Sequence, residues 1–176
     1  VSRHGERYPL EVISTSLRRP SQLRAAIKWA DLLISGGGTF LHEADFALYG
    51  RSFLLRKRKL RPIPYFLSIV LFARSLGVPV MWYGQGLGPL HTATARRLVA
   101  AAGSVSQALA WRDSDSARLA YEVGIRGPVQ MVVPDSAYAL TPATEGAARV
   151  LAENGLPPDR PYVAVCPRPW LGRTDF

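Results

Sequence analysis

The sequence predicts an α/β fold, a doubly wound parallel sheet with helices on both faces. Three observations support this prediction. Short apolar segments typical of buried strands alternate along the chain with segments of helical periodicity. Glycine-rich or polar turns follow several of the strand-like segments. The chain has 176 residues, 48% of them hydrophobic, and this suffices for a domain with a sizeable core.

Five segments have the periodicity and end signals of helices. The first places Leu23, Ile27 and their neighbours on one apolar face. The second begins at Pro62 and stops before Gly77, a typical C-terminal cap. The fourth opens with acidic residues, which favour the positive end of the helix dipole. The predicted helices span residues 21–30, 62–76, 92–102, 113–123 and 144–154.

Six apolar segments, rich in β-branched or aromatic residues, fit strands between these helices. They span residues 8–14, 31–35, 78–83, 108–111, 129–133 and 161–166. Residues 154–161 are rich in proline and glycine and resemble a linker. We therefore expect a first domain over residues 1–156, truncated at its N-terminus because the chain begins with Val1. Residues 157–176 are expected to hold a linker and the first strand of a second domain.

A glycine triplet, Gly36-Gly37-Gly38, follows the predicted strand at residues 31–35. Residues without Cβ let a ligand approach the backbone, and ligands of open α/β sheets bind at the carboxyl ends of strands. Exposed N–H groups there suit a phosphate or a carboxylate. The alternative is a tight connection that binds nothing. The triplet fits neither the Walker A pattern nor Gly-x-Gly-x-x-Gly.

A second glycine-rich segment, Gly84-Gln85-Gly86, follows the predicted strand at residues 78–83. The Gln85 amide can both donate and accept hydrogen bonds. Alternatively, the segment is a flexible loop with an exposed glutamine. Because both glycine-rich segments follow parallel strands, we expect them to open on the same edge of the sheet and to face one cleft.

Charged side chains follow three further predicted strands. Arg112 comes after residues 108–111 and can face the same cleft. Asp135 comes after residues 129–133; it suits a sugar hydroxyl or a general base, although aspartate after proline is also a common turn residue. Arg168 lies between two prolines after residues 161–166 and suits bidentate binding of a carboxylate or phosphate. A plain surface arginine, or one that stacks on Trp170, is the alternative.

The net charge of +9 favours anionic partners. Basic residues gather at Arg51, Arg56, Lys57, Arg58, Lys59 and Arg61. Such a run of basic side chains usually forms a solvent-exposed face, but it is also suited to binding anionic lipid or a diphosphate-linked acceptor. Nearby aromatics leave single-stranded nucleic acid open.

Several classes of protein have little support. One cysteine excludes an internal disulfide, and the three histidines lack metal-ligand spacing, so we expect no metal site. Hydrolase and metalloprotease motifs are absent from the sequence. No apolar stretch is long enough to span a bilayer.

The ordered set of these motifs resembles the polysaccharide pyruvyl transferase family, which includes bacterial enzymes acting on cell-wall and exopolysaccharide sugars. The matching pieces are residues 30–41, 77–80, 84–90, 111–114, 134–137 and 163–170. One departure is His42-Glu43, where family members often have Gln-Asp. This puts any role of these two positions in doubt.

The resemblance implies a Rossmann-like domain, the N-terminal part of an enzyme similar to GT-B glycosyltransferases, whose second Rossmann-like domain is missing here. It implies transfer of the enolpyruvyl unit of phosphoenolpyruvate to two sugar hydroxyls, giving a cyclic ketal and phosphate without a cofactor. Asp135 is then the candidate base. The candidate substrate-binding residues are Gly36, Gly37, Gly38, Gln85, Gly86, Arg112 and Arg168.

The same resemblance leads to expectations about binding partners and cellular location. The acceptor is a lipid-linked or polymeric saccharide, the enzyme is cytoplasmic with a peripheral membrane contact through the basic run, and no nucleic acid is expected. Because the site should lie between two domains, this chain alone is expected to be inactive. The alternatives are a GT-B glycosyltransferase that uses a nucleotide sugar, and a non-catalytic basic α/β module that binds nucleic acid or membrane.

Overall fold

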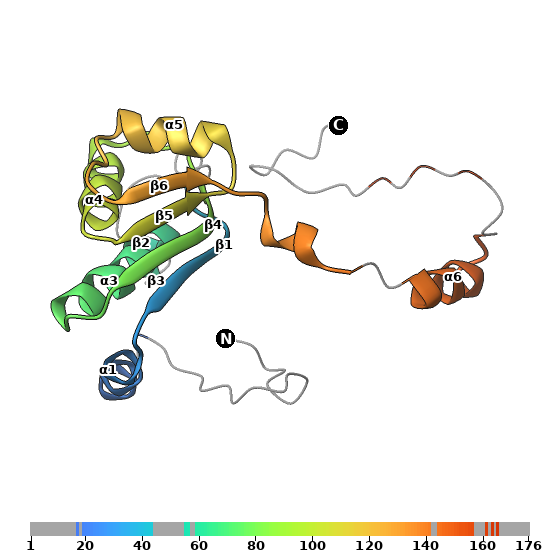
Figure 1. Ribbon diagram of the computed structural model, residues 1–176, viewed down its shortest axis with the longest axis horizontal. Coiled ribbons are helices and arrows are strands. Elements are labelled where there is room, and N and C mark those ends of the chain that lie inside the picture. The colour runs from blue at the N-terminus through green and yellow to red at the C-terminus, as the bar shows by residue number, and fades with distance from the viewer. Residues whose placement is uncertain are drawn as a thin grey trace. The chain divides into compact units, whose positions relative to one another are not determined.

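Four parallel strands form the central sheet of the computed structural model (Figure 1). The structure describes residues 17, 19–43, 55–56, 59–141, 144–156, 161, 163 and 165; for residues 55–56, 59–60 and 144–145 it describes the backbone alone. The strands are β1 (Leu33–Leu41), β4 (Val80–Leu87), β5 (Ala108–Trp111) and β6 (Val129–Val132), side by side in that order. The predicted parallel α/β fold is thus confirmed.

Each parallel strand is connected to the next by a helix. α3 (Pro62–Ser75) connects β1 to β4, α4 (Ala93–Ser104) connects β4 to β5, and α5 (Ser114–Glu122) connects β5 to β6. α1 (Pro20–Trp29) precedes β1. These four helices lie within one or two residues of their predicted bounds. A short antiparallel pair that the sequence did not predict, β2 (Leu55–Arg56) and β3 (Lys59–Leu60), precedes α3.

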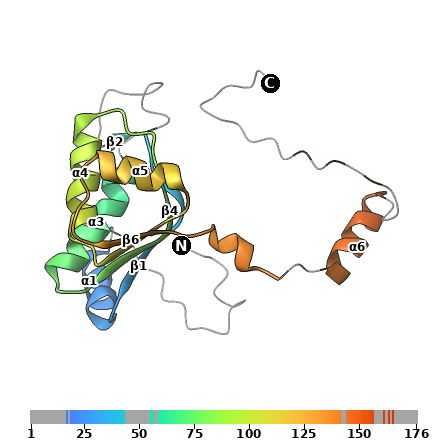
Figure 2. The same ribbon diagram turned by 45° about the horizontal axis from the view of Figure 1, so that its top comes forward.

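The core lies between the sheet and these helices. Because every connection moves one strand further in the same direction, right-handed crossovers place α3, α4 and α5 on one face (Figure 2). Trp82 and Trp111 project from that face and pack edge to face, with ring centroids 5.7 Å apart. Such a pair contributes about 0.5–1.5 kcal/mol beyond its buried area.

The opposite face of the sheet is apolar and, in the part of the chain described here, exposed. Ile34, Tyr83, Val129 and Met131 lie there and are all exposed to solvent. Helices on both faces, as a doubly wound sheet requires, therefore stay a prediction.

A second compact unit comprises residues 136–176, and residues 1–135 form the first. The second unit contains a 3₁₀ turn (Ser136–Ala139) and α6 (Thr144–Glu153), which was predicted. The last predicted strand is wrong at the three residues described there, Pro161, Val163 and Val165, which lie in no strand. The predicted strand at residues 8–14 lies outside the described residues.

Both glycine-rich segments belong to strands, so their prediction as loops after the strands is wrong. β1 continues through Gly36, Gly37 and Gly38, and β4 continues through Gly84 to Leu87. Gly36 pairs with Tyr83, and Gly38 pairs with Gln85. Glycine has low strand propensity in isolation, but the pairing between the two strands outweighs it.

Glu43 joins the end of β1 to the start of α4. Its side chain is buried, and its carboxylate accepts hydrogen bonds from the backbone N–H groups of His91 and Thr92, at 2.6 and 2.7 Å, and from the Thr92 hydroxyl at 2.7 Å. Thr92 in turn caps α4 by accepting from the Ala95 N–H at 3.1 Å.

Replacing Gly36 by alanine should destabilise the domain more than replacing Gly37. A Cβ on Gly36 would collide with the Tyr83 carbonyl oxygen, whereas a Cβ on Gly37 meets open space and incurs only the strain of a φ of 85°. We expect a loss of roughly 1–3 kcal/mol for Gly36→Ala and of about 1–2 kcal/mol for Gly37→Ala. Urea unfolding of both variants measures the difference. Equal losses would show that relieving the contact between Gly36 and Tyr83 costs no more than the backbone strain at Gly37, and would contradict the prediction.

Removing the Glu43 carboxylate should destabilise the N-terminal end of α4. In Glu43→Gln the amide oxygen can still accept from both backbone N–H groups, and Nε2 can donate to the Thr92 hydroxyl, but these bonds lose the negative charge. A hydrogen bond to a charged group contributes about 1.5–3 kcal/mol, against about 0.5–1.5 kcal/mol for a neutral one, so a net loss is expected. Hydrogen exchange of the α4 amides should accelerate together with a fall in the free energy of unfolding. Unchanged exchange in Glu43→Gln would contradict this account, and Glu122→Gln, at an exposed helix position, provides the control.

Candidate functional site

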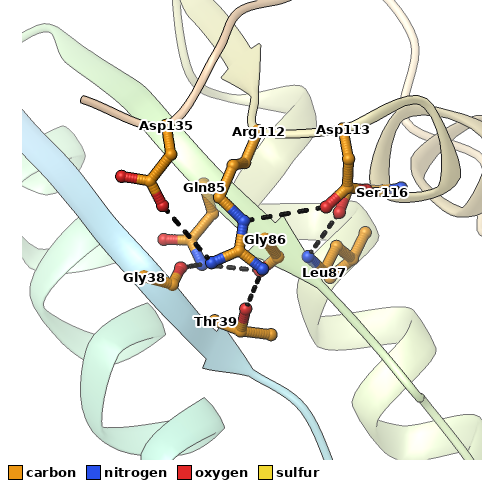
Figure 3. A network of polar contacts seen from close by, with 9 residues as sticks. All are labelled: Gly38, Thr39, Gln85, Gly86, Leu87, Arg112, Asp113, Ser116 and Asp135. Carbon is orange, nitrogen blue, oxygen red and sulfur yellow. Dashed lines mark hydrogen bonds and ion pairs between the residues drawn. The ribbon is translucent and has the colours of Figure 1, made fainter. Parts of the chain in front are cut away.

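Polar residues from four neighbouring strands converge at the carboxyl edge of the sheet (Figure 3). Thr39 lies in β1, Gln85 in β4, Arg112 directly after β5 and Asp135 three residues after β6. The carboxyl edge is where open α/β sheets usually bind ligands. Thr39, Arg112, Asp113 and Asp135 are called the strand-end cluster below.

The guanidinium of Arg112 is the centre of the strand-end cluster. Its Nη2 donates a hydrogen bond to the Thr39 hydroxyl at 2.7 Å. Its Nη1 lies 3.7 Å from Oδ2 of Asp135, and its Nε lies 3.7 Å from Oδ2 of Asp113. Figure 3 shows these three contacts radiating from one side chain. Arg112 thus connects β1, the start of α5 and the segment after β6.

Gly86 makes room for this arrangement. A Cβ at this position would collide with the Thr39 hydroxyl oxygen and would lie 3.0 Å from Nη2 of Arg112. The glycine is therefore needed for the contact between Thr39 and Arg112. Substrate binding by Gly86 stays a prediction.

Gln85 is buried and bonds to the sheet itself. Its Nε2 donates to the carbonyl oxygens of Gly38, at 2.9 Å, and of Gly86, at 2.7 Å. The predicted neighbours Gly38 and Gln85 thus do lie together. The amide N–H groups, however, already donate to one carbonyl of β1 and one of β4 itself, so a ligand contact through Gln85 stays a prediction.

Asp113 caps α5 and borders Arg112. Its Oδ1 accepts a hydrogen bond from the Ser116 N–H at 2.7 Å. Burial raises the pKa of this carboxyl, but the hydrogen bonds from Ser116 and the positive charge of Arg112 outweigh burial, so the pKa lies below its ordinary value of 3.8. Asp113 is therefore negatively charged at neutral pH.

The remaining predicted site residues fall outside this cluster. Arg168 lies outside the described residues, so its role stays a prediction. In the basic run, Arg51, Lys57 and Arg58 also lie outside them, and Arg56 and Lys59 belong to β2 and β3 with side chains that are not described.

Arg61 corrects one expectation about the basic run. Its side chain is only 7% exposed, directly before α3, and does not belong to a solvated basic face. Among the described helices, none combines the length and the apolar character that a bilayer crossing requires.

Thr39 is the site residue that sequence reasoning missed. The signal was its position directly after the glycine triplet, but the predicted loop hid the alternation of side chains along a continuous strand.

An apolar cavity of about 260 Å³ lies along β1 and α3, lined by Leu33, Ile34, Ser35, Gly36, Phe40, Phe66, Ile69 and Val70. None of the side chains that line this cavity is charged.

The charge of Asp113 should contribute to stability in a pH-dependent way. Because its pKa is lower in the folded chain than in the unfolded chain, the contribution is present above about pH 4 and is lost as the pH falls through the folded pKa. Asp113→Asn keeps a side-chain oxygen that can cap α5 but removes the carboxyl group that titrates. Its free energy of unfolding should fall less between about pH 5 and pH 3 than that of the wild type. Asp115→Asn, which removes an exposed carboxylate from the same helix, is the comparison variant.

The comparisons with known proteins agree with the resemblance. The family model described as polysaccharide pyruvyl transferase matches residues 4–174 of the 176 residues. No curated protein and no solved structure gives a significant match. The family model covers the parallel sheet, both glycine-rich strands and every residue of the strand-end cluster. The chain therefore belongs to the polysaccharide pyruvyl transferase family.

Proposed function

We propose that the protein transfers the pyruvyl unit of phosphoenolpyruvate to two hydroxyls of a saccharide, giving a cyclic ketal and inorganic phosphate. Family membership supports the reaction class. The observation that carries the proposal to this chain is the strand-end cluster, in which Asp135 and Arg112 lie 3.7 Å apart at the ligand-binding edge of a parallel sheet.

The chemistry requires proton transfers at defined atoms. A proton adds to the methylene carbon of phosphoenolpyruvate, and the resulting cationic C2 is attacked by the first hydroxyl, which loses its proton. The C2–O bond to phosphate then breaks, and the second hydroxyl adds to C2 and loses its proton in turn. One released proton balances the one taken up by carbon, and the other leaves with phosphate or solvent.

Asp135 is the proposed base for a hydroxyl proton. Its side chain retains 40% of its exposure, so a hydroxyl group can reach it. A carboxylate within hydrogen-bond reach of an attacking hydroxyl serves as a general base.

Arg168 is the proposed contact for an anionic group of phosphoenolpyruvate. It resembles the family's arginine at this position, and its flanking prolines restrict the backbone. Truncating an arginine that pairs with a buried carboxylate or phosphate costs about 2–5 kcal/mol of binding.

The test is phosphate release by the full-length protein with phosphoenolpyruvate and a lipid-diphosphate disaccharide, with the ketal detected by mass spectrometry. Arg168→Ala should raise the KM for phosphoenolpyruvate by at least about 30-fold, the lower end of the free energy above. Arg118→Ala, which removes an exposed arginine on α5, is the matched control and should leave the KM unchanged.

Two results would count against the proposal. Unchanged phosphoenolpyruvate affinity in Arg168→Ala would remove that residue from the site. Release of a nucleoside diphosphate from a nucleotide sugar, with no phosphate from phosphoenolpyruvate, would instead make the protein a glycosyltransferase.

A further inference from the structure

The sheet holds the side-chain amide of Gln85 in one orientation. The residue is only 2% exposed, and Nε2 donates to the carbonyl oxygens of Gly38, at 2.9 Å, and of Gly86, at 2.7 Å (Figure 3). A carbonyl oxygen accepts hydrogen bonds and cannot donate them, so the amide nitrogen must face both carbonyl groups. A flipped amide would place its oxygen against two further acceptors and leave them unpaired. The position of the amide oxygen is therefore fixed as well.

This amide oxygen is open to a ligand. Among the described residues no group donates a hydrogen bond to Oε1 of Gln85, and the side-chain atoms of that part of the chain that are sealed from solvent without a partner do not include it. Oε1 therefore borders solvent although the residue as a whole is buried. An acceptor in such a site costs free energy when no donor is present, so it favours a ligand that supplies one.

Two other glutamines of the sheet use their amide oxygens within the protein. Oε1 of Gln107, directly before β5, accepts from the Val80 N–H at 3.0 Å. Oε1 of Gln130, in β6, accepts from the indole N–H of Trp111, also at 3.0 Å. Gln85 differs from both because its amide oxygen is left for a donor from outside the described residues.

The open acceptor lies at the edge of the sheet that carries the strand-end cluster. Gln85 belongs to β4, which lies between β1 and β5, and its backbone carbonyl accepts from the Arg112 N–H at 3.1 Å. A Cβ on the next residue, Gly86, would lie 3.0 Å from Nη2 of Arg112. Oε1 of Gln85 is therefore available at the carboxyl edge, where open α/β sheets usually bind ligands.

A lone acceptor distinguishes ligands by what they can donate. Fully ionised phosphoenolpyruvate consists of a carboxylate, a phosphate and a methylene group, so it has no N–H or O–H. A saccharide carries several hydroxyl groups, and each of them is a donor. Of the two substrates of the proposed reaction, the saccharide is therefore the one that can hydrogen-bond to Oε1 of Gln85.

We propose that Oε1 of Gln85 accepts a hydrogen bond from a hydroxyl group of the saccharide acceptor and makes binding selective for that hydroxyl. This inference rests on the proposed function and assigns one contact of the saccharide. Nε2 has the structural part, because it joins β4 to the Gly38 carbonyl of β1. A saccharide without the hydroxyl would leave the oxygen without a donor in the complex, and such a mismatch is strongly selected against.

The first experiment replaces hydroxyl groups of a probe. Saturation-transfer NMR measures binding of methyl β-glucoside, methyl β-galactoside and methyl β-mannoside to the full-length protein. The tightest of the three is then compared with its monodeoxyfluoro and monoamino analogues, because fluorine cannot donate a hydrogen bond and an amino group can. At one ring position, fluorine should weaken binding about 5-fold or more and an amino group should retain it. Binding of no glycoside, or no position with this difference, would overturn the inference.

The second experiment shows whether that effect depends on Gln85. Gln85→Met removes Oε1 and should abolish the effect of fluorine at that position, while effects at other positions persist. Gln107→Met, which removes an amide whose oxygen bonds to Val80, is the matched control and should keep the wild-type pattern. If Gln85→Met unfolds, Gln85→Lys takes its place, because it supplies donors to the two carbonyls without an acceptor. Fluorine effects equal to those of the wild type would make the role of Gln85 structural alone, and the inference would be wrong.

A third measurement separates this inference from the proposed function. Titration calorimetry measures phosphoenolpyruvate binding to the full-length wild type, Gln85→Met and Gln107→Met, without saccharide. The two variants should agree within about 2-fold, whereas a loss of about 10-fold or more in Gln85→Met relative to Gln107→Met would place phosphoenolpyruvate on Gln85 and overturn the inference. If the wild type binds no phosphoenolpyruvate, the proposed function fails, while a fluorine effect that depends on Gln85 would still support a saccharide site.

Discussion

The close pairing of β1 with β4 is the constraint on which the rest of the sheet edge depends. Tyr83 lies so near Gly36 that no side chain fits between the two backbones, and the buried Gln85 amide bonds to the Gly38 carbonyl oxygen. Amide hydrogen bonds in a buried site are strong because water does not compete for them. Beyond this point Gly86 lies beside Thr39, so the contact between Thr39 and Arg112 depends on the same pairing.

The sequence was most informative where local signals agreed with the fold. Periodic apolar residues, Pro62 at a helix start and Gly77 at a helix end placed α3 correctly, and the cap at Asp113 placed α5. The glycine-rich segments failed because glycine signals a turn locally, whereas here the adjacent strand determines the conformation. Gly36 lacks a side chain because the backbone of β4 lies against it. A sequence does not show which strand is the neighbour, so this role of the glycine could not be predicted.

The candidate site was predictable in outline but not in its contacts. In a parallel sheet the carboxyl ends of the strands share one edge, so charged residues after predicted strands must gather there. Arg112 and Asp135 do so, 3.7 Å apart. Their partners depend on the register, which shifts between Gly38 and Leu41 in β1 and between Trp82 and Gln85 in β4. Such shifts leave no signal in a single sequence, and the loop predicted at the glycine triplet also hid Thr39, which lies within the shift in β1.

The sign of the charge at the strand ends differs from that of the whole chain. The net charge of +9 acts on an approaching anion from a distance, within a screening length of about 8–10 Å at ordinary salt. The charged groups of the strand-end cluster, Arg112, Asp113 and Asp135, act only at contact and sum to the opposite sign. The long-range attraction of an anion and the contacts at the strand ends therefore have different physical origins. Ionic strength weakens the long-range attraction more than it weakens contacts within the cluster.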